Sequence, residues 1–181
     1  MARIDRTTAY AKLVVSGKRL ASKAEISCCR RHLDDLKRSK SKDFPYIFDV
    51  KEAEKHISIA NMLVIGEGTE EKQLTTRGFQ NFILGNIFGW REKGSTGKNI
   101  VIRYREAYVQ MGRQNGKSFL AGVLCNDFAT FSGYQYGLVL CTATKQDQAN
   151  IVWGEVVKFL QSDPQLGELY ERPRKYTHEI T

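Results

Sequence analysis

The sequence lacks C-x-x-C pairs, clustered histidines, long apolar runs and an apolar N-terminal stretch, which are features of zinc-binding, membrane and secreted proteins. Its four cysteines form no C-x-x-C pair and its three histidines are isolated, which argues against a zinc site and predicts buried, reduced thiols in a cytosolic protein. No run approaches the roughly 18 apolar residues of a membrane span. The N-terminus has no apolar stretch of the secretory type. What remains is a globular chain of 181 residues with one or two domains and no expected membrane contact.

The net charge of +8 is confined to one end of the chain. Residues 1–42 hold 12 Lys/Arg against 4 Asp/Glu, whereas residues 43–181 hold 16 of each. Such asymmetry indicates a polyanionic partner, which is either nucleic acid or an acidic protein surface. A solvated, partly disordered arm is the alternative, and composition alone does not decide between the two.

Helical patterns occupy the first part of the chain. Ser22 and Glu25 have the spacing of a capping box, and apolar residues follow them at helical intervals. Asp49 and Glu52 repeat this spacing ahead of a second helix. Residues 66–73 are polar and acidic, and they are predicted to form a linker.

The clearest functional pattern lies over residues 106–131. A β-prone run at 106–111 leads into a polar, glycine-marked loop, and a helix is predicted from Lys117. Backbone N–H groups and the helix dipole can then converge on a phosphate group. Gly116 allows a close approach, Lys117 supplies a positive charge, and the Ser118 hydroxyl is placed to bind Mg²⁺. The pattern predicts a phosphate-binding loop for ATP.

This loop departs from the pattern G-x-x-x-x-G-K-[ST]. Its first glycine should stand at Met111, but Gly112 comes one residue later. Residues 94–99 contain similar letters, yet β-branched residues follow them, so a hairpin turn is predicted there. A glycine-rich turn with a chance lysine is the alternative at residues 112–118. The flanking strand and helix favour the phosphate loop.

The order of the predicted elements indicates an α/β fold. The predicted strands cover residues 100–104, 106–111 and 136–142. Helices are predicted over residues 76–88 and 117–131, and a further one is predicted to be capped by Thr144 and Asp147. We expect a P-loop NTPase-type parallel sheet flanked by helices, with nucleotide at the carboxyl ends of the strands. Residues 1–70 would form a small helical segment before it, and residues 71–181 the first half of the ATPase domain.

Several of these stretches together resemble the large terminase subunits of tailed double-stranded DNA phages. The resemblance runs from about residue 10 to residue 166. Its motifs are Ser16-Gly17-Lys18, RHLDDL at 31–36, FPYIFD at 44–49, FQNFIL at 79–84, Phe88-Gly89-Trp90, GRQNGKS at 112–118, Thr142-Ala143-Thr144 and Asp147-Gln148-Ala149. The phosphate loop, with its arginine and shifted first glycine, is the most specific of them.

The resemblance implies an enzyme that uses ATP and Mg²⁺ to pump double-stranded DNA into a procapsid, joined to a nuclease that cuts concatemers. Gln80 falls on the family's adenine-recognition glutamine. Arg113 matches the loop arginine proposed to stabilise transition-state charge. Arg113 and Lys117 are therefore the candidate catalytic residues, and Ser118 is the candidate Mg²⁺ ligand. The implied nucleotide-binding residues are Gln80, Gly112, Arg113, Gln114, Asn115, Gly116, Lys117 and Ser118.

The implied partners are DNA, the portal protein and the small terminase subunit. The implied setting is an oligomeric ring on the procapsid, in the cytoplasm of an infected bacterium. Two other functions stay open. One is a helicase-like, nucleic-acid-dependent ATPase, and the other is a non-catalytic docking module for DNA, portal or small subunit.

One expected part of the ATPase is missing from the sequence. A hydrolysing P-loop ATPase needs an acidic pair at the end of an apolar strand, and no such run follows Lys117. Residues 123–127 come nearest, but they belong to a predicted helix. The nuclease carboxylates are missing as well. We therefore expect a C-terminally incomplete chain that binds nucleotide and hydrolyses little of it.

Overall fold

The chain divides into two compact units. The computed structural model describes residues 4–67, 70–73, 75–95, 100–133, 138–170, 174 and 180. Unit 1 consists of residues 1–58 and 76–109, and unit 2 of residues 59–75 and 110–181. Helix α3 (Val50–Met62) contributes residues to both. The predicted division into residues 1–70 and 71–181 is a statement about domains, which these packing units do not test, and it stays a prediction.

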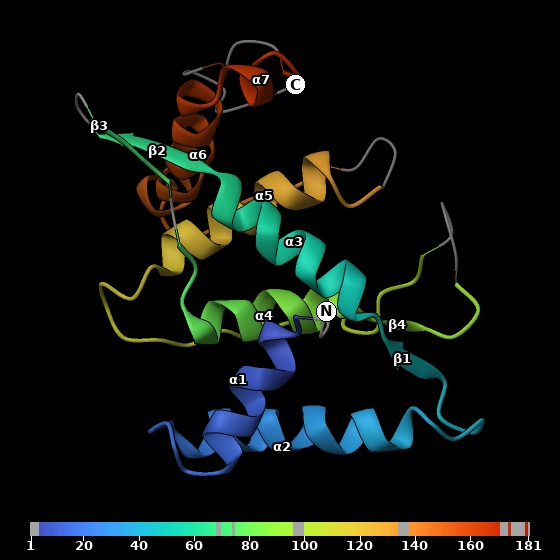
Figure 1. Ribbon diagram of the computed structural model, residues 1–181. Coiled ribbons are helices and arrows are strands. Elements are labelled where there is room, and N and C mark those ends of the chain that lie inside the picture. Colours follow the sequence, from blue (N-terminus) through green and yellow to red (C-terminus); the bar gives the residue numbers. More distant parts are fainter. Residues whose placement is uncertain are drawn as a thin grey trace. The chain divides into compact units, whose positions relative to one another are not determined.

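Three helices form one end of unit 1: α1 (Arg6–Val15), α2 (Lys23–Arg38) and α4 (Gly78–Gly89). Helix α1 packs against both α2 and α4 (Figure 1). Its contact with α4 is close because Gly85 has no side chain, since a Cβ there would lie 1.8 Å from Oγ1 of Thr7. The apolar core between the three helices consists of Tyr10, Ala11, Val14, Cys29 and Phe82.

A short antiparallel sheet forms the other part of unit 1. Strand β1 (Tyr46–Phe48) pairs with β4 (Trp90–Glu92), so that Phe48 lies opposite Trp90. The core beside it contains Phe44, Phe48, Ala53 and Trp90. Because the sheet and the helices present mainly rings to each other, aromatic edge-to-face contacts dominate this core.

The buried His32 of α2 joins the two cores of unit 1. Nε1 of Trp90 donates to Nδ1 of His32 at 3.1 Å, and Nε2 of His32 lies 3.0 Å from Oγ1 of Thr8. The same Nδ1 also lies 3.2 Å from Oδ1 of Asn86, so the ring makes polar contacts with three segments of unit 1. Burial lowers the pKa of His32, which keeps the ring neutral.

Arg103 fixes the segment that leads out of unit 1. Its guanidinium lies 2.7 Å from the buried carboxylate of Asp35 on α2. The rings around it belong to Phe44, Tyr46, Trp90 and Tyr104, at 4.9–5.2 Å. An arginine that is both paired and stacked in this way holds its backbone firmly. The chain therefore leaves unit 1 from an anchored point, nine residues before Gly112.

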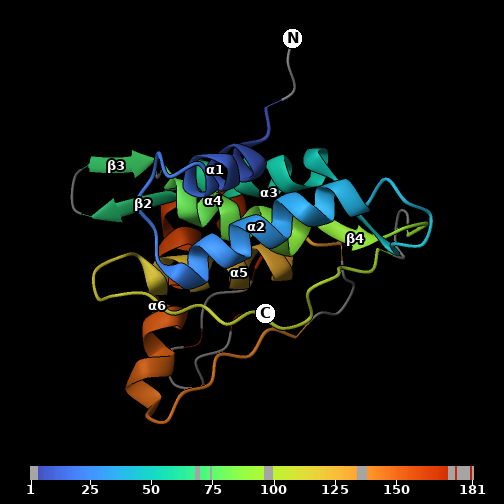
Figure 2. The same ribbon diagram turned by 90° about the horizontal axis from the view of Figure 1, so that it is seen from below.

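Unit 2 contains a β-hairpin and three helices. Strands β2 (Val64–Glu67) and β3 (Glu70–Gln73) pair antiparallel (Figure 2). The helices are α5 (Lys117–Thr130), α6 (Gln146–Ser162) and the short α7 (Pro164–Gly167). Helix α6 packs against α5, β2 and α7. The buried apolar residues of these helices are Leu120, Val123, Phe159, Leu160 and Leu166.

Most predicted helix starts are confirmed. Oγ of Ser22 accepts from the Glu25 N–H at 3.2 Å at the start of α2, and Oδ1 of Asp49 accepts from the Glu52 N–H at 3.2 Å. Helix α5 begins at Lys117 as predicted. The predicted cap of α6 is wrong: the helix begins at Gln146 after Lys145, and no side chain caps it.

The parallel sheet is the main correction. Both sheets in the described part of the chain are two-stranded and antiparallel. Residues 106–111 and 138–142 form no strand, residues 136–137 lie outside the described part, and residues 100–104 contribute a single bridge between Ile102 and Arg91. A β-prone run becomes a strand only where another backbone satisfies its N–H and C=O groups along its length. For the run 100–104 the pairing is short: the Glu92 N–H donates to the Val101 carbonyl, and the Arg103 N–H donates to the Trp90 carbonyl. The mixed helix and strand content is consistent with α/β in the broad sense.

Three smaller expectations can be compared with the same structure. The linker predicted at residues 66–73 is wrong, because the β2–β3 hairpin occupies it. The turn predicted at residues 94–99 stays a prediction, because residues 96–99 lie outside the described part; before and after them, the N–H of Glu92 donates to the carbonyl of Val101. All four cysteines are free, but only Cys29 is buried.

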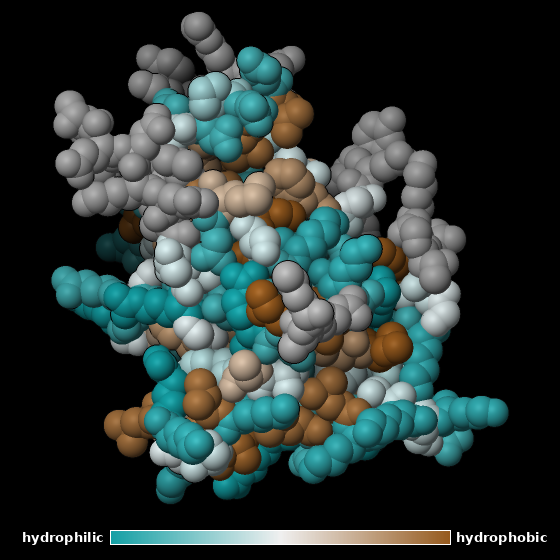
Figure 3. Space-filling view, in the orientation of Figure 1, coloured by the Kyte–Doolittle hydropathy of each residue, from teal (hydrophilic) through white to brown (hydrophobic). Residues whose placement is uncertain are grey.

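The surface of the described residues is mixed in character. Hydrophilic side chains lie among apolar ones over α2, at the foot of Figure 3. Among the helices that the structure describes, none has both the length and the apolarity that a bilayer crossing requires.

Candidate nucleotide-binding site

The predicted phosphate loop is an exposed turn with two left-handed residues. Gln114 has φ 61° and Gly116 has φ 73°. Left-handed backbone suits a glycine, whereas a glutamine adopts it only at a cost of about 1 kcal/mol or more. The amide of Asn115 holds the turn by donating to the carbonyls of Gly112 at 3.3 Å and Arg113 at 3.1 Å. The loop is therefore shaped by its own side chains and by backbone strain.

Helix α5 begins at the end of this loop with its first turn uncapped by any side chain. Gly116 is the N-cap, and its carbonyl accepts the first helical bond, from the N–H of Leu120 at 2.9 Å. A glycine cannot cap the N–H groups of the first turn, so these groups are available to an external acceptor. The 14-residue helix also directs the positive end of its dipole to this point.

The charges at the start of α5 oppose the stability of the helix. Its first turn contains no acidic residue, and its first residue is Lys117. A cation at a helix N-terminus costs about 0.3–1 kcal/mol. Arg113 and Lys117 are both exposed, and neither forms an ion pair with the described residues. An anion at this point would offset the charge of the helix end and of both side chains.

Packing in unit 2 fixes the position of α5. A Cβ on Gly122 would lie 2.9 Å from Cβ of Glu155, so the two helices approach closely at this glycine. The rings of Phe119 and Phe159 meet edge-on at 5.9 Å, and Val123 is fully buried. A site carried on a packed helix is held more precisely than one on a free loop. Ser118 is half-buried on this helix, one residue after Lys117.

Gln80 lies in unit 1, whereas residues 112–118 lie in unit 2. Its side chain is 5% exposed, and its Oε1 accepts from the Arg77 N–H at 2.8 Å. Gln80 therefore caps the first turn of α4, a role that the usual capping-box pattern does not predict because the N-cap residue is Arg77 rather than Ser or Thr. Its amide nitrogen has no hydrogen-bond partner among the described residues. The structure thus brings seven of the eight predicted residues together in one loop and helix.

Sequence reasoning missed two features of α5. Asn126 and Asp127 are buried in the second half of this mainly apolar helix. Cys125 lies with its Sγ 3.5 Å from Sγ of Cys141. Burial, and then the contact with Cys141, raise the pKa of the Cys125 thiol to about 12. No spacing rule in the sequence joins residues 125 and 141, so this contact could not be found without coordinates.

An uncapped, positively charged helix start of this kind is typical of anion-binding sites in proteins. Comparison with protein families gives the finer assignment. The family described as "Terminase large subunit, ATPase domain" matches residues 78–176, which is more than half of the chain and includes the loop and helices α4 to α7. The chain therefore belongs to the large terminase subunits, a family of DNA-packaging ATPases. No curated protein and no solved structure matches the chain.

Proposed function

We propose that this chain is the ATP-binding part of a viral DNA-packaging motor, with the phosphates held by residues 112–118. The observation that carries the proposal is the uncapped start of α5, where Lys117 and a strained loop occupy the matched region of the family. In this proposal the N–H groups of the first turn and Lys117 bind the β- and γ-phosphates. Gly112, Arg113, Gln114, Asn115 and Gly116 form the wall of the cradle.

Ser118 is the proposed protein ligand of Mg²⁺. Its hydroxyl is an oxygen donor of the type that Mg²⁺ accepts alongside phosphate oxygens and water. When bound, Mg²⁺ neutralises charge on the phosphates. Arg113 is exposed and forms no ion pair among the described residues, so it can reach a γ-phosphate in the same chain or in a neighbouring subunit.

Gln80 is the proposed adenine-recognition residue. Its Oε1 already accepts one hydrogen bond, from Arg77, but a carbonyl oxygen has a second lone pair and the amide nitrogen has two donors. One amide can therefore cap α4 and still bind an adenine edge, which presents a donor beside an acceptor. In that case the cap holds the amide in the orientation that recognition needs.

Hydrolysis by these 181 residues alone is proposed to be weak. Arg113 and Lys117 can neutralise a triphosphate, but no acidic pair ends an apolar strand after Lys117. The nearest candidate, Asp127, lies within α5 rather than at the end of a strand, and it is buried. Without a carboxylate to position water, turnover should fall by orders of magnitude.

The wider role is proposed from the family. In the full-length protein, the ATPase would move double-stranded DNA into a procapsid from a ring docked on the portal, with the small subunit as partner and a nuclease that cuts concatemers. It would act in the cytoplasm of the infected bacterium. Residues 71–181 would belong to the ATPase domain.

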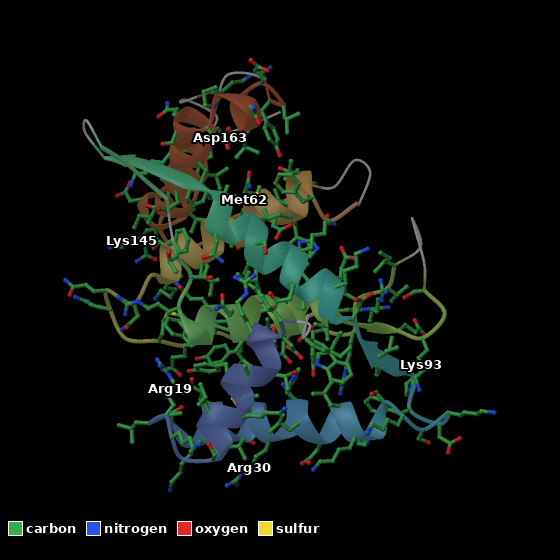
Figure 4. All side chains as sticks on the ribbon, viewed as in Figure 1. Arg19, Arg30, Met62, Lys93, Lys145 and Asp163 are labelled. Carbon is green, nitrogen blue, oxygen red and sulfur yellow. The ribbon has the colours of Figure 1, made fainter. Side chains whose placement is uncertain are left out.

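A docking role for unit 1 is a second candidate, favoured by its charge. The exposed basic residues of α2 are Lys23, Arg30, Arg31, Lys37 and Arg38. Arg30 lies on the side of α2 away from α1 (Figure 4) and forms no ion pair among the described residues. Arg30→Glu should weaken binding to a DNA duplex and reduce its salt dependence if DNA is the partner.

The experiment that tests the leading proposal is calorimetry with ATP and Mg²⁺. Lys117→Ala should weaken binding by about 1.5–3 kcal/mol, the value of a charge-assisted contact. Lys98→Ala is the matched control, because Lys98 also follows a glycine but lies in the predicted hairpin turn. Equal affinity of the wild type and Lys117→Ala would reject the loop assignment. A phosphate-release assay on the same samples should stay at background, and turnover abolished by Lys117→Ala would show that a catalytic carboxylate is present.

A further inference from the structure

Two cysteines of unit 2 lie within reach of each other although 15 residues separate them in the chain. Cys125 is half-buried on α5, and Cys141 is exposed in the segment that precedes α6. Their sulfur atoms are 3.5 Å apart. Both thiols are free, so the contact is a weak hydrogen bond between sulfur atoms rather than a covalent bond.

The surroundings of the pair fit a reversible disulfide better than a structural thiol contact. A disulfide brings two sulfur atoms to about 2.05 Å, so closure needs a movement of only about 1.5 Å from the present contact. Cys141 lies in a stretch, residues 138–148, whose side chains are all exposed, so this stretch can supply the movement. Cys125 sits on a packed helix and provides the fixed end.

We propose that Cys125 and Cys141 are a redox-controlled modification site, which closes as an intramolecular disulfide and fixes the segment 138–145 to α5. The remaining cysteines, Cys28 and Cys29, belong to unit 1, and one of them is buried. The disulfide would restrain the helix that begins with Lys117. The proposal concerns the thiols alone and does not depend on nucleotide binding.

The chemistry balances with a small-molecule disulfide as the oxidant. The exposed Cys141 thiolate attacks one sulfur of glutathione disulfide, which forms a mixed disulfide and releases one glutathione thiolate. The Cys125 thiolate then attacks the Cys141 sulfur, forms the Cys125–Cys141 bond and releases the second glutathione thiolate. The two cysteines lose two protons and two electrons. Glutathione disulfide takes up both electrons, and the two protons go to the released thiolates or to solvent.

The order of these steps follows from exposure. Cys141 is open to the reagent, whereas Cys125 is partly covered and its thiol resists ionisation because burial raises its pKa to about 12. The second step should therefore limit the rate, and closure should accelerate as the pH rises.

The test uses the 181-residue chain with glutathione disulfide and mass spectrometry. The peptide map of the oxidised wild type should show residue 125 linked to residue 141 with the loss of two hydrogen atoms from that pair, whereas the exposed Cys28 can carry a glutathione. Dithiothreitol should restore the original mass. The double variant C28S/C29S should form the same link and lose the mass of two hydrogen atoms as a whole protein, whereas C125S and C141S should each stop at a mixed disulfide or remain unmodified at the remaining cysteine of the pair.

A second measurement covers the case in which a serine variant folds poorly. Trypsin should cleave more slowly after the exposed Lys145 (Figure 4) in the oxidised wild type than in the reduced wild type, with no substitution involved. The disulfide should also raise the unfolding midpoint by roughly 5–10 °C, since it closes a loop of about 16 residues in the unfolded chain. An unchanged mass, a linkage through residue 28 or 29, or a dimer as the main product would overturn the proposal.

Discussion

Unit 1 and unit 2 differ in what their buried residues accomplish. In unit 1, rings pack against one another and polar groups cross-link distant segments, as in the contacts of His32 with Trp90 and of Arg103 with Asp35. In the described part of unit 2, burial is mainly the contact between α5 and α6, and the candidate site lies exposed at one end of α5. Unit 1 is organised as a scaffold and unit 2 as the carrier of a loop.

The backbone strain that can be identified among the described residues lies in unit 2. The only left-handed residue other than glycine among the described residues is Gln114, in the candidate phosphate loop. The same loop precedes a helix with a lysine in place of an acidic residue in its first turn. A stably packed structure elsewhere in the chain can tolerate a left-handed glutamine and a lysine at a helix start, although each is locally unfavourable.

Alkaline pH should produce the largest contrast within unit 1. Burial raises the pKa of the Cys29 thiol from 9.0 to about 12, and burial and the Glu25 hydrogen bond raise that of Tyr10 from 10.0 to about 12. The folded unit favours both neutral forms, so this stability is complete below pH 9 and is lost as the pH rises towards 12. By pH ~11, unit 1 should lose about 2–3 kcal/mol through Cys29.

Urea denaturation in a Trp153→Phe background measures this loss, because Trp90 then reports on unit 1 alone. Cys29→Ala is the control, and its stability should depend less steeply on pH even if its stability at pH 8 is lower. Equal pH dependence of the two proteins would show that Cys29 does not ionise on unfolding.

Gly85→Ala should break the close packing of α1 on α4. The new Cβ would meet Oγ1 of Thr7 at 1.8 Å and Cβ of Thr7 at 2.9 Å, so the helices must separate. Overpacking of this kind costs about 1–3 kcal/mol. Hydrogen exchange of α1 and α4 should rise while that of α6 stays unchanged. The double variant Thr7→Ala/Gly85→Ala should recover part of the loss, and no recovery would mean that the clash lies elsewhere.

Local signals allowed much of this molecule to be predicted from the sequence. The caps at Ser22 and Asp49 and the start of α5 at Lys117 depend on residues three or four positions apart. The β1–β4 pairing joins residues more than 40 positions apart, and helix α1 owes its place to a glycine at position 85. Such partners are invisible to periodicity, which is why the strands at 106–111 and 136–142 were expected in a sheet that the described residues do not form.

The candidate site shows the same division between local and distant information. The loop and Lys117 followed from an unbroken stretch of sequence. Gln80 was assigned by resemblance, and its cap of Arg77 appears only in coordinates, although the spacing of the two residues permits it. The cap of α4 and the proposed recognition of adenine are two roles of Gln80 that an experiment can separate.

Gln80→Glu separates the cap of α4 from adenine recognition. A carboxylate still accepts from the Arg77 N–H and suits a helix N-terminus, but it has no amide donor. The preference for ATP over GTP should therefore fall by the value of one hydrogen bond, about 0.5–1.5 kcal/mol, while α4 remains stable. Gln80→Ala should lose both the preference for ATP and the stability of α4. Calorimetry with ATP and GTP measures the first, and hydrogen exchange of α4 measures the second. An unchanged nucleotide preference in Gln80→Glu would remove Gln80 from the site.

The smallest expected effect is a gain in unit 2, at Gly154 of α6. An ideal Cβ at this position meets no atom within 4 Å, in contrast to the Cβ at Gly85. A glycine inside a helix costs roughly 0.5–1 kcal/mol relative to alanine, because the unfolded chain loses more freedom on folding. Gly154→Ala should therefore stabilise α6 by about that amount, and its amides should exchange more slowly while those of α4 stay unchanged. The same substitution thus has opposite signs in the two units, and the sign is set by what the new methyl group meets. A loss of stability in Gly154→Ala would show that another part of the protein covers this face of α6 in solution.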